Sequence, residues 1–461
     1  MSKRFYRFRS LDSLLEKYKE LESQTIYFAS PTELNDPMEG FKNLVFNGDK
    51  IVWRNFFKHY LLCLEHVSSL YILCGEEHHN ITEDSIPIFN GFDEFPTPMY
   101  KELFQKIYNE TFLLCESFID KISTRRTSIR KDEIGLYLTM FHSIAVEVIE
   151  KNYAQKQFIE QRKTSYHLDN TGFKKLEEMI DVIEKAIIET EDESIVSTLF
   201  LIQKQMQDEF HLISNLQSNL LVKSPNRNFL LIDFIDNYLN KIENLMYPEW
   251  YTACFMTESH NSSVWGHYGD EHEGVCLIFE TNENNKISFD KNTTGLEFKP
   301  VEYNEEFIEI DFFKSIGSLP QKKLIDTWYI DDKKTISDIA DSLINDHKKW
   351  HKNHWYNFDK VVLTKTKDWE YEKEYRLILS SILEQKIDKK DRVYKYDFNN
   401  LKGLIFGIKT PLEKKLEIIE IIKSKCELKN REDFEFYQAY YCHINKNIQH
   451  RKMSFLKFKK D

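Results

Sequence analysis

Residues 367–381, KDWEYEKEYRLILSS, place three glutamates among aromatic residues directly before an apolar segment. The alternation over 374–380 predicts a β-strand on which Glu374 and Arg376 share one face, with Glu372 on the same side. Two carboxylates held close together raise the pKa of one of them, which suits general acid–base chemistry. A structural ion pair between Arg376 and a glutamate explains the same pattern, so the pattern alone leaves both interpretations open.

Further strand signals lie on both sides of this segment. After Pro248 they are rich in β-branched and aromatic residues, over 250–258, 274–280, 296–303, 392–398, 401–408 and 434–441. At the other end of the chain, KRFYRFR at 3–9 puts Arg7 and Arg9 on one face of a strand. The stretch TIYFAS at 25–30 predicts a second strand, which leads into a turn-rich loop.

The middle of the chain has a different period. From about 50 to 246 the apolar residues recur at helical spacing, as in the stripe Leu103, Ile107 and Phe118. We therefore predict an α+β fold, with a mixed or antiparallel sheet core built from both chain ends and interrupted by a large all-helical insertion. The predicted parts are a discontinuous α+β domain at 1–46 and 248–445, a helical insertion at 47–247, and a basic C-terminal tail at 446–461.

Composition restricts the classes of function. The chain has only 13 glycines and neither a G-x-G-x-x-G nor a P-loop pattern, which argues against a glycine-rich phosphate cradle. The formal net charge of −12 repels polyanions unless basic residues cluster, so nucleic acid is a possible partner that the charge does not imply. Seven scattered cysteines, no apolar leader and no long apolar run predict a cytoplasmic protein that does not enter a membrane.

Two further stretches carry candidate site residues. In VWGHYGDEHEGVCLIFE, residues 264–280, His267 can serve as a base beside Tyr268, and Trp265 as a stacking platform. Aromatic packing on a short helix explains these residues equally well. In SPTELNDPMEG, residues 30–40, the side chains of Asn35 and Asp36 can contact a substrate or simply hold the loop through turn and capping hydrogen bonds.

The segment HKKWHKNHW, residues 347–355, has histidines at helical spacing: His347, His351 and His354. Such spacing can present metal ligands on one helix face. The segment lacks the glutamate base of an H-E-x-x-H motif, and its lysines would repel a cation. We therefore predict a solvated helix face and no metal site.

Three of these stretches together resemble a bacterial family, domain of unknown function twenty-nine seventy-one. The resemblance rests on YRFRSLDS…IYFASPTELNDPMEG, on CFMTESHNSSVWGHYGDEHEGVCLIFE and on KTKDWEYEKEYRLIL, within residues 1–46 and about 248–410. In typical members the first two motifs lie much closer together, and here about 200 helical residues separate them. Members often occur in bacterial defence neighbourhoods, which implies an effector or toxin role.

The same stretches are also similar to parts of ADP-ribosyltransferase-like folds, which bind NAD. That resemblance matches Arg7 or Arg9 to a first-strand arginine, Ser30 to a second-strand residue, and Glu372-x-Glu374 to a late E-x-E element. Taken together with the residue patterns above, it predicts catalysis by Glu374, Glu372, His267 and Tyr268. The predicted NAD contacts are Arg7, Arg9, Ser30, Asn35, Asp36, Trp265 and Arg376.

The implied reaction breaks the nicotinamide–ribose bond through an oxocarbenium-like transition state, which a nearby carboxylate stabilises. Two alternatives of other classes stay open at this point. One is a metal-dependent nuclease that uses Asp36, Glu39, Glu372 and Glu374. The other is a non-catalytic sensor whose helical insertion binds a phage or host protein, and a cleft without solvent-exposed Glu374 and Arg9 would favour it.

Overall fold

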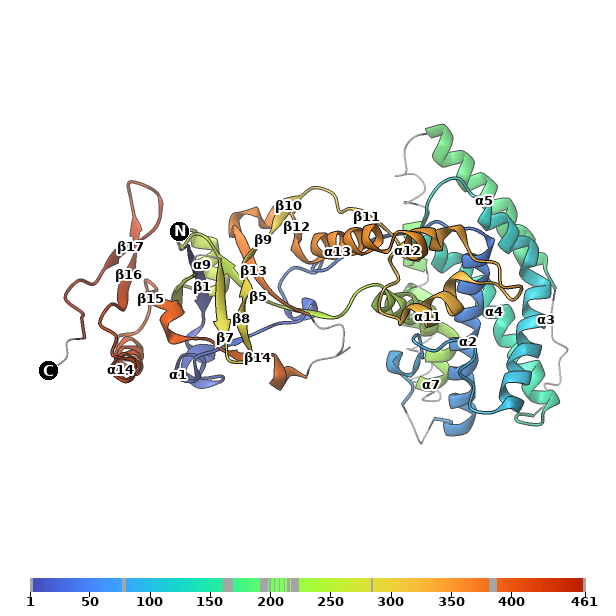
Figure 1. Ribbon diagram of the computed structural model, residues 1–461, viewed down its shortest axis with the longest axis horizontal. Coiled ribbons are helices and arrows are strands. Elements are labelled where there is room, and N and C mark those ends of the chain that lie inside the picture. The colour runs from blue at the N-terminus through green and yellow to red at the C-terminus, as the bar shows by residue number, and fades with distance from the viewer. Residues whose placement is uncertain are drawn as a thin grey trace. The chain divides into compact units, whose positions relative to one another are not determined.

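The computed structural model divides the chain into two compact units, each with its own core (Figure 1). It describes residues 3–76, 80–160, 169–190, 224–282, 285–380 and 388–458, together with 198, 200–202, 204–206, 208–210, 212–213 and 216. The sheet unit comprises Met1–Lys42, Pro248–Ile308 and Phe358–Asp461. The helical unit comprises Asn43–Tyr247 and Glu309–Asn357.

The sheet unit contains most of the strands. Its strands are β1 (Arg4–Arg9), β2 (Thr25–Tyr27), β5 (Trp250–Met256), β6 (Val275–Glu280), β7 (Lys286–Phe289), β8 (Asn292–Glu297), β9 (Lys299–Pro300), β10 (Glu302–Asn304), β12 (Thr364–Thr366), β13 (Glu374–Ser380), β14 (Val393–Lys395), β15 (Leu401–Phe406), β16 (Glu435–Cys442) and β17 (Asn447–Lys452). Its helices are α1 (Glu20–Ser23), α9 (Ser262–Tyr268) and α14 (Leu412–Lys429).

The central sheet confirms the predicted core from both chain ends. Its strand order is β17-β16-β15-β6-β1-β5-β13-β9, so the N-terminal strand lies among strands from the C-terminal half. All neighbours pair antiparallel except β15 and β16. Alternation along β1 sends Phe5 into the core on one face and Phe8 into the core on the other.

The helical unit confirms a large helical segment in the N-terminal half of the chain, although the unit also contains short strands and is not all-helical. Its helices are α2 (Lys50–Cys74), α3 (Pro98–Ser123), α4 (Lys131–Gln155), α5 (Thr171–Thr190), α7 (Pro225–Asn228), α8 (Phe234–Lys241), α10 (Phe312–Ser315), α11 (Gln321–Leu324), α12 (Asp341–Asn345) and the start of α13 (His347–Leu363). Its strands are β3 (Asn43–Phe46), β4 (Ile129–Arg130) and β11 (Glu309–Asp311). Helix α2 begins after Asp49, whose carboxylate accepts hydrogen bonds from two backbone N–H groups of the first turn.

The unit boundaries differ from the predicted ones in three places, the smallest being that residues 43–46 fall in the helical unit instead of the α+β domain. The prediction assigns Glu309–Asn357 to the α+β domain, whereas the structure groups this segment with the helical unit, because β11 pairs with β3. The prediction treats 446–461 as a tail, whereas Asn447–Lys452 forms the edge strand β17 against β16. Residues 459–461 of that predicted tail lie outside the described residues.

Two histidines in the core of the helical unit are buried in their neutral form. His59 Nε2 donates to the carbonyl of Ile88 at 2.9 Å, and His59 Nδ1 lies 2.9 Å from the Tyr238 hydroxyl. His142 Nδ1 lies 2.8 Å from the Tyr60 hydroxyl. Burial disfavours the charged imidazolium, so it lowers the pKa of His59 and of His142 from 6.5 to about 4.

These two histidines should make the protein less stable at moderately acidic pH. Between pH 6.5 and 4 the unfolded chain binds protons that the folded chain does not, so the free energy of unfolding falls as the pH falls. We expect a loss of about 2 to 3 kcal/mol per histidine, measured by urea unfolding across this range. A His142→Phe variant should lose its share of the pH dependence, whereas the exposed His443→Gln variant should keep the wild-type slope. Equal slopes in all three proteins would contradict the assignment.

Candidate functional site

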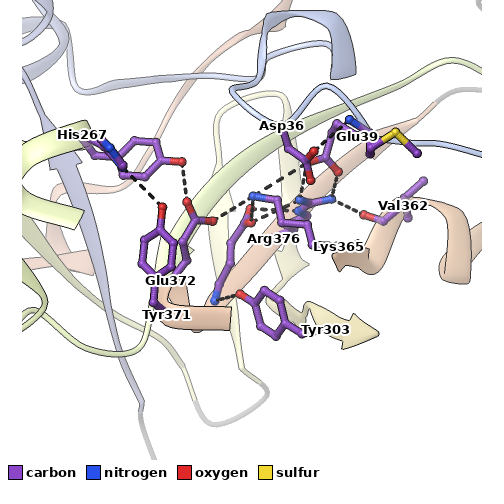
Figure 2. A network of polar contacts seen from close by, with 12 residues as sticks. Asp36, Glu39, His267, Tyr303, Val362, Lys365, Tyr371, Glu372 and Arg376 are labelled. Atoms are coloured by element: carbon purple, nitrogen blue, oxygen red, sulfur yellow. Dashed lines mark hydrogen bonds and ion pairs between the residues drawn. The ribbon is translucent and has the colours of Figure 1, made fainter. Parts of the chain in front are cut away.

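A chain of alternating charges lies beside β13 in the sheet unit (Figure 2). It runs from Glu39 through Arg376, Glu374 and Lys365 to Glu372, and neighbouring members lie within ion-pair distance. Each of the five side chains is at most 5% exposed. Buried charges are stable only when they are paired and hydrogen-bonded, and this arrangement meets that condition.

Arg376 forms the first half of this ion network. Its guanidinium binds both carboxylate oxygens of Glu39, with NH2 2.8 Å from Oε2, and its Nε donates to Glu374 Oε1 at 2.9 Å. A further N–H donates to the carbonyl of Val362. Arg376 is 0% exposed, so these partners occupy it completely within the fold.

Lys365 forms the second half. Its ammonium lies 2.7 Å from Glu374 Oε2 and 2.9 Å from Glu372 Oε2. Burial disfavours the charged ammonium, but Glu374 and Glu372 together raise the pKa of Lys365 above its usual value. In the opposite sense, burial alone would raise the pKa of Glu374, but Arg376 and Lys365 lower it to about 2. Glu374 is therefore a carboxylate at neutral pH.

Two tyrosine hydroxyls fix the ends of this segment. The Tyr268 hydroxyl, at the last residue of α9, donates to Glu372 Oε1 at 2.6 Å. Burial and the Glu372 charge raise the pKa of Tyr268, which keeps it a donor. The Tyr303 hydroxyl, on β10, accepts the backbone N–H of Glu374 at 2.7 Å. Glu372 and Glu374 are thus held in place at both side chain and backbone.

The ion network borders a cavity of about 380 Å³ in the same unit. Strand β1, strand β5, the loop after β2 and helix α9 form its other walls. The polar lining residues include Arg7, Arg9, Tyr27, Glu33, Asn35, Cys254, His267, Tyr268, Asp270, Lys365, Glu372 and Glu374. A cavity with convergent polar groups and perturbed ionisable residues is a candidate ligand site.

Arg7 occupies a gap between two strands at the cavity wall. Strands β1 and β5 pair at Tyr6 and Met256, and beyond that pair the Arg7 side chain reaches the carbonyls of Cys254, at 3.1 Å, and Tyr27, at 3.5 Å. Arg7 is 8% exposed, and among the described residues no carboxylate lies within ion-pair distance of it. Burial and the neighbouring Arg9 lower the pKa of Arg7 to about 10. Arg7 is therefore a buried cation without a counter-ion of its own.

Seven of the predicted site residues line this one cavity: Arg7, Arg9, Asn35, His267, Tyr268, Glu372 and Glu374. Among them, Arg9 is already paired, because its Nε donates to Glu20 Oε2 at 2.6 Å. The His267 ring is exposed, and its Nδ1 lies 3.4 Å from the Tyr371 hydroxyl.

Four other predicted residues do not line the cavity. Trp265 is 0% exposed, packs edge-on against Phe8 and donates its indole N–H to a backbone carbonyl, so it cannot stack on a ligand. The guanidinium of Arg376 is fully paired inside the ion network. Ser30 caps the short 3₁₀ helix that follows it, and Asp36 is buried with one oxygen on the Met38 N–H at 2.8 Å. In each case the side chain is engaged in contacts within the fold.

Several residues that line or support the site were absent from the predicted set, among them Lys365, Cys254 and Tyr303. Lys365 lies in the polar stretch TKT, which carries no strand signal, and β12 forms only by parallel pairing with β10. Alternation in WYTACFMTE places Cys254 on the same strand face as Met256, so the sequence pattern could have predicted Cys254 as a site residue.

The absence of a metal site stays a prediction. Among the residues that the structure describes, no group of three or more histidine, cysteine, aspartate or glutamate side chains is arranged to hold a metal ion. In the 347–355 segment, His347 and His351 are exposed, whereas His354 is 6% exposed and stacks on Trp350.

Residues 264–377 match the family model described as "Protein of unknown function (DUF2971)". This match confirms the predicted resemblance to that family for residues 264–377, a shorter part of the chain than the stretches that carry the resemblance. It contains Tyr268, Lys365, Glu372, Glu374 and Arg376. No curated protein and no solved structure gives a significant match. Within the described part of the chain, no helix is long and apolar enough to cross a membrane.

Proposed function

We propose that the cavity binds NAD and that the protein is an ADP-ribosyltransferase-like enzyme that breaks the nicotinamide–ribose bond. The observation that carries this proposal is the buried Arg7, a guanidinium at the cavity wall that has two carbonyl partners and, among the described residues, no carboxylate within ion-pair distance. A charge buried without a counter-ion is costly, and an anionic ligand would supply the missing charge. A guanidinium fork suits a pyrophosphate in particular.

The carboxylates of the same cavity suit the other half of such a ligand. When the bond between ribose C1′ and the nicotinamide nitrogen breaks, the bonding electron pair leaves with neutral nicotinamide and positive charge develops on the ribose. The sugar is then captured by water or by a nucleophile of an acceptor, which forms the new bond to C1′ and releases a proton. A fixed carboxylate beside C1′ stabilises the developing cation.

Between the two carboxylates, Glu372 is the better candidate for this role. Glu374 pairs with two cations, Arg376 and Lys365, whereas Glu372 pairs with Lys365 alone and accepts its other hydrogen bond from neutral Tyr268. Glu372 therefore keeps the larger share of its negative potential. We assign stabilisation of the ribose cation to Glu372, and the positioning of Lys365 to Glu374.

The same contacts favour a non-catalytic sensor over a metal-dependent nuclease as the second candidate. Lys365 and Arg376 already pair with Glu39, Glu372 and Glu374, three of the four acidic residues that a nuclease would use, and their charges repel a divalent cation. The 2% exposure of Glu374 favours a sensor, although the Arg9 side chain is 23% exposed. Such a sensor would bind its protein partner through the helical insertion and hold NAD in the cavity without cleaving it. The effector or toxin role in bacterial defence stays a prediction.

Replacing Arg7 should separate ligand binding from folding. In Arg7→Gln we expect NAD to bind about 30- to 150-fold more weakly, because a buried charge contact is worth about 2 to 3 kcal/mol. Calorimetric titration with NAD measures this change. The wild type and the variant would also be incubated with adenylate-labelled NAD and cell lysate, and released nicotinamide would be quantified.

The control for Arg7 lies on the same strand. Arg4 is 38% exposed in its side chain and pairs with Glu280 and Glu435, so Arg4→Gln should leave NAD affinity unchanged. NAD binding with no label transfer and no nicotinamide release would support the sensor. No binding of NAD to the wild type would refute the proposal itself.

A further inference from the structure

Helix α13 begins with a segment that is both basic and rich in aromatic rings. Residues 347–356, HKKWHKNHWY, contain three lysines and three histidines and no aspartate or glutamate. The whole chain carries a formal net charge of −12, so this segment is an exception to its surroundings. A local excess of one charge sign marks a surface for a partner of the opposite sign.

Three rings form a row along one face of this helix. The ring centroids of His347 and His351 lie 6.2 Å apart, and those of His351 and Trp355 lie 6.0 Å apart. The Trp355 indole N–H donates to His351 Nε2 at 2.9 Å, which fixes the two rings relative to each other. Both histidines are exposed and Trp355 is half-buried, so the row presents planar surfaces to solvent.

The lysines beside this row are exposed and unpaired. Lys348, Lys349 and Lys352 are all exposed, and within the part of the chain that the structure describes none of their ammonium groups forms an ion pair or a hydrogen bond. Elsewhere in the same unit, Lys314 lies 3.1 Å from Asp311 and Lys323 lies 2.6 Å from Glu94. Lys348 and Lys352 are four residues apart, as His347 and His351 are, and each lysine directly follows one of these histidines. The two lysines therefore form a row beside the row of rings.

The opposite side of the helix is anchored in the unit. Trp350 donates its indole N–H to the carbonyl of Lys314 at 3.0 Å. His354 is buried between Trp350 and Tyr247, with ring centroids 4.7 and 4.8 Å away. A side chain at Gly317 would collide with the His354 ring, since its Cβ would lie 2.4 Å from that ring. The outer face is therefore held in a fixed orientation.

We propose that the outer face of α13, formed by His347, Lys348, His351, Lys352 and Trp355 with the adjacent Lys349, binds single-stranded nucleic acid. The lysines supply contacts to successive phosphates, and the row of rings supplies surfaces on which unpaired bases stack. This inference concerns a surface outside the NAD cavity and does not depend on the proposed reaction.

The composition of the face distinguishes this partner from a membrane surface and from a duplex. A helix that lies on a membrane buries an aliphatic and aromatic stripe in the lipid, and this face has no leucine, isoleucine or valine. Bases in a duplex are stacked on each other and offer no free ring face, so the row of rings adds affinity only for an unpaired strand.

The test is the binding of fluorescein-labelled single-stranded RNA and DNA of mixed sequence to the full chain, followed by anisotropy at several salt concentrations. Changing Lys348, Lys349 and Lys352 to glutamine together should weaken binding about 100-fold near 0.1 M salt and reduce the salt slope by about 2. His351→Ala should weaken binding about tenfold and leave the salt slope unchanged, because stacking releases no counter-ions.

A matched triple variant tests whether position matters. Lys101, Lys174 and Lys175 are exposed lysines on α3 and α5, and changing all three to glutamine alters the net charge equally. The control variant should bind like the wild type, and circular dichroism should show intact helices in all variants. No binding by the wild type, an equal loss in the control, equal affinity for a duplex, or tighter binding to phosphatidylserine vesicles would each overturn the proposal.

Discussion

Replacing Glu372 by glutamine should reduce the release of nicotinamide from NAD about 100- to 1,000-fold, the usual effect of removing one group that stabilises transition-state charge. Glutamine keeps the shape of the side chain and can still accept the Tyr268 hydrogen bond, but it carries no charge to oppose the ribose cation. The ammonium of Lys365 keeps its ion pair with Glu374 at 2.7 Å, so the unfolding temperature should stay close to the wild-type value. Steady-state release of nicotinamide and thermal unfolding measure the two effects.

Glu370 provides the matched control for this change. It lies on the same 3₁₀ helix, Lys367–Glu372, but it is exposed and forms no ion pair among the described residues. Glu370→Gln should therefore leave the rate unchanged. Glu374→Gln is a less informative variant, because it removes the counter-charge of both Arg376 and Lys365 and lowers stability together with activity. A Glu372→Gln enzyme that is folded and fully active would refute the role assigned to Glu372.

The fold class was predictable because its signals are local. Alternation in KRFYRFR and in EYRLILS marks strands, and helical stripes such as Leu103, Ile107 and Phe118 mark the insertion. The unit boundary at 309–357 was not predictable in this way, because it depends on the pairing of β11 with β3, segments about 260 residues apart. Such non-local pairing leaves no trace in the composition of either segment.

Part of the candidate site was also predictable from the sequence. The sequence pattern places Arg7, Glu372 and Glu374 at strand positions, and the structure brings all three to one cavity. It does not show which carboxylates have counter-ions, since Arg376 meets Glu39 across a sequence separation of 337 residues. Lys365 was not predicted either, because only the three-dimensional fold brings its ammonium between Glu372 and Glu374.

The burial of Trp265 shows a second limit of sequence reasoning. An aromatic residue near a histidine in a short helix fits a stacking platform and a core position equally well. The choice depends on which helix face meets the sheet, and α9 turns Trp265 toward Phe8 of β1. His267, two residues further on, falls on the exposed side and lines the cavity. Of the two roles that the pattern left open, Trp265 has the core position and His267 the position at the cavity.

Replacing Arg376 by methionine should lower the free energy of unfolding by about 3 to 5 kcal/mol, which is the cost of removing one partner from a buried ion pair. Methionine fills a similar volume but leaves Glu39 and Glu374 facing each other with Lys365 as their only cation. Burial raises the pKa of Glu39 even though Arg376 acts to lower it. Without Arg376, the Glu39 carboxylate should therefore take up a proton more readily. Urea unfolding at neutral pH measures the loss.

Two further variants show whether this loss comes from the buried network. Arg4 pairs with Glu280 and Glu435 at the surface, and Arg4→Met should cost less than about 1 kcal/mol because solvent screens exposed pairs. Adding Glu39→Gln to Arg376→Met removes one of the two unpaired carboxylates and should restore part of the lost stability, a coupling that a double-mutant cycle measures directly. If Arg376→Met costs no more than Arg4→Met, the alternating charges beside β13 do not stabilise the fold, and Lys365 alone must hold Glu372 and Glu374 at the cavity wall.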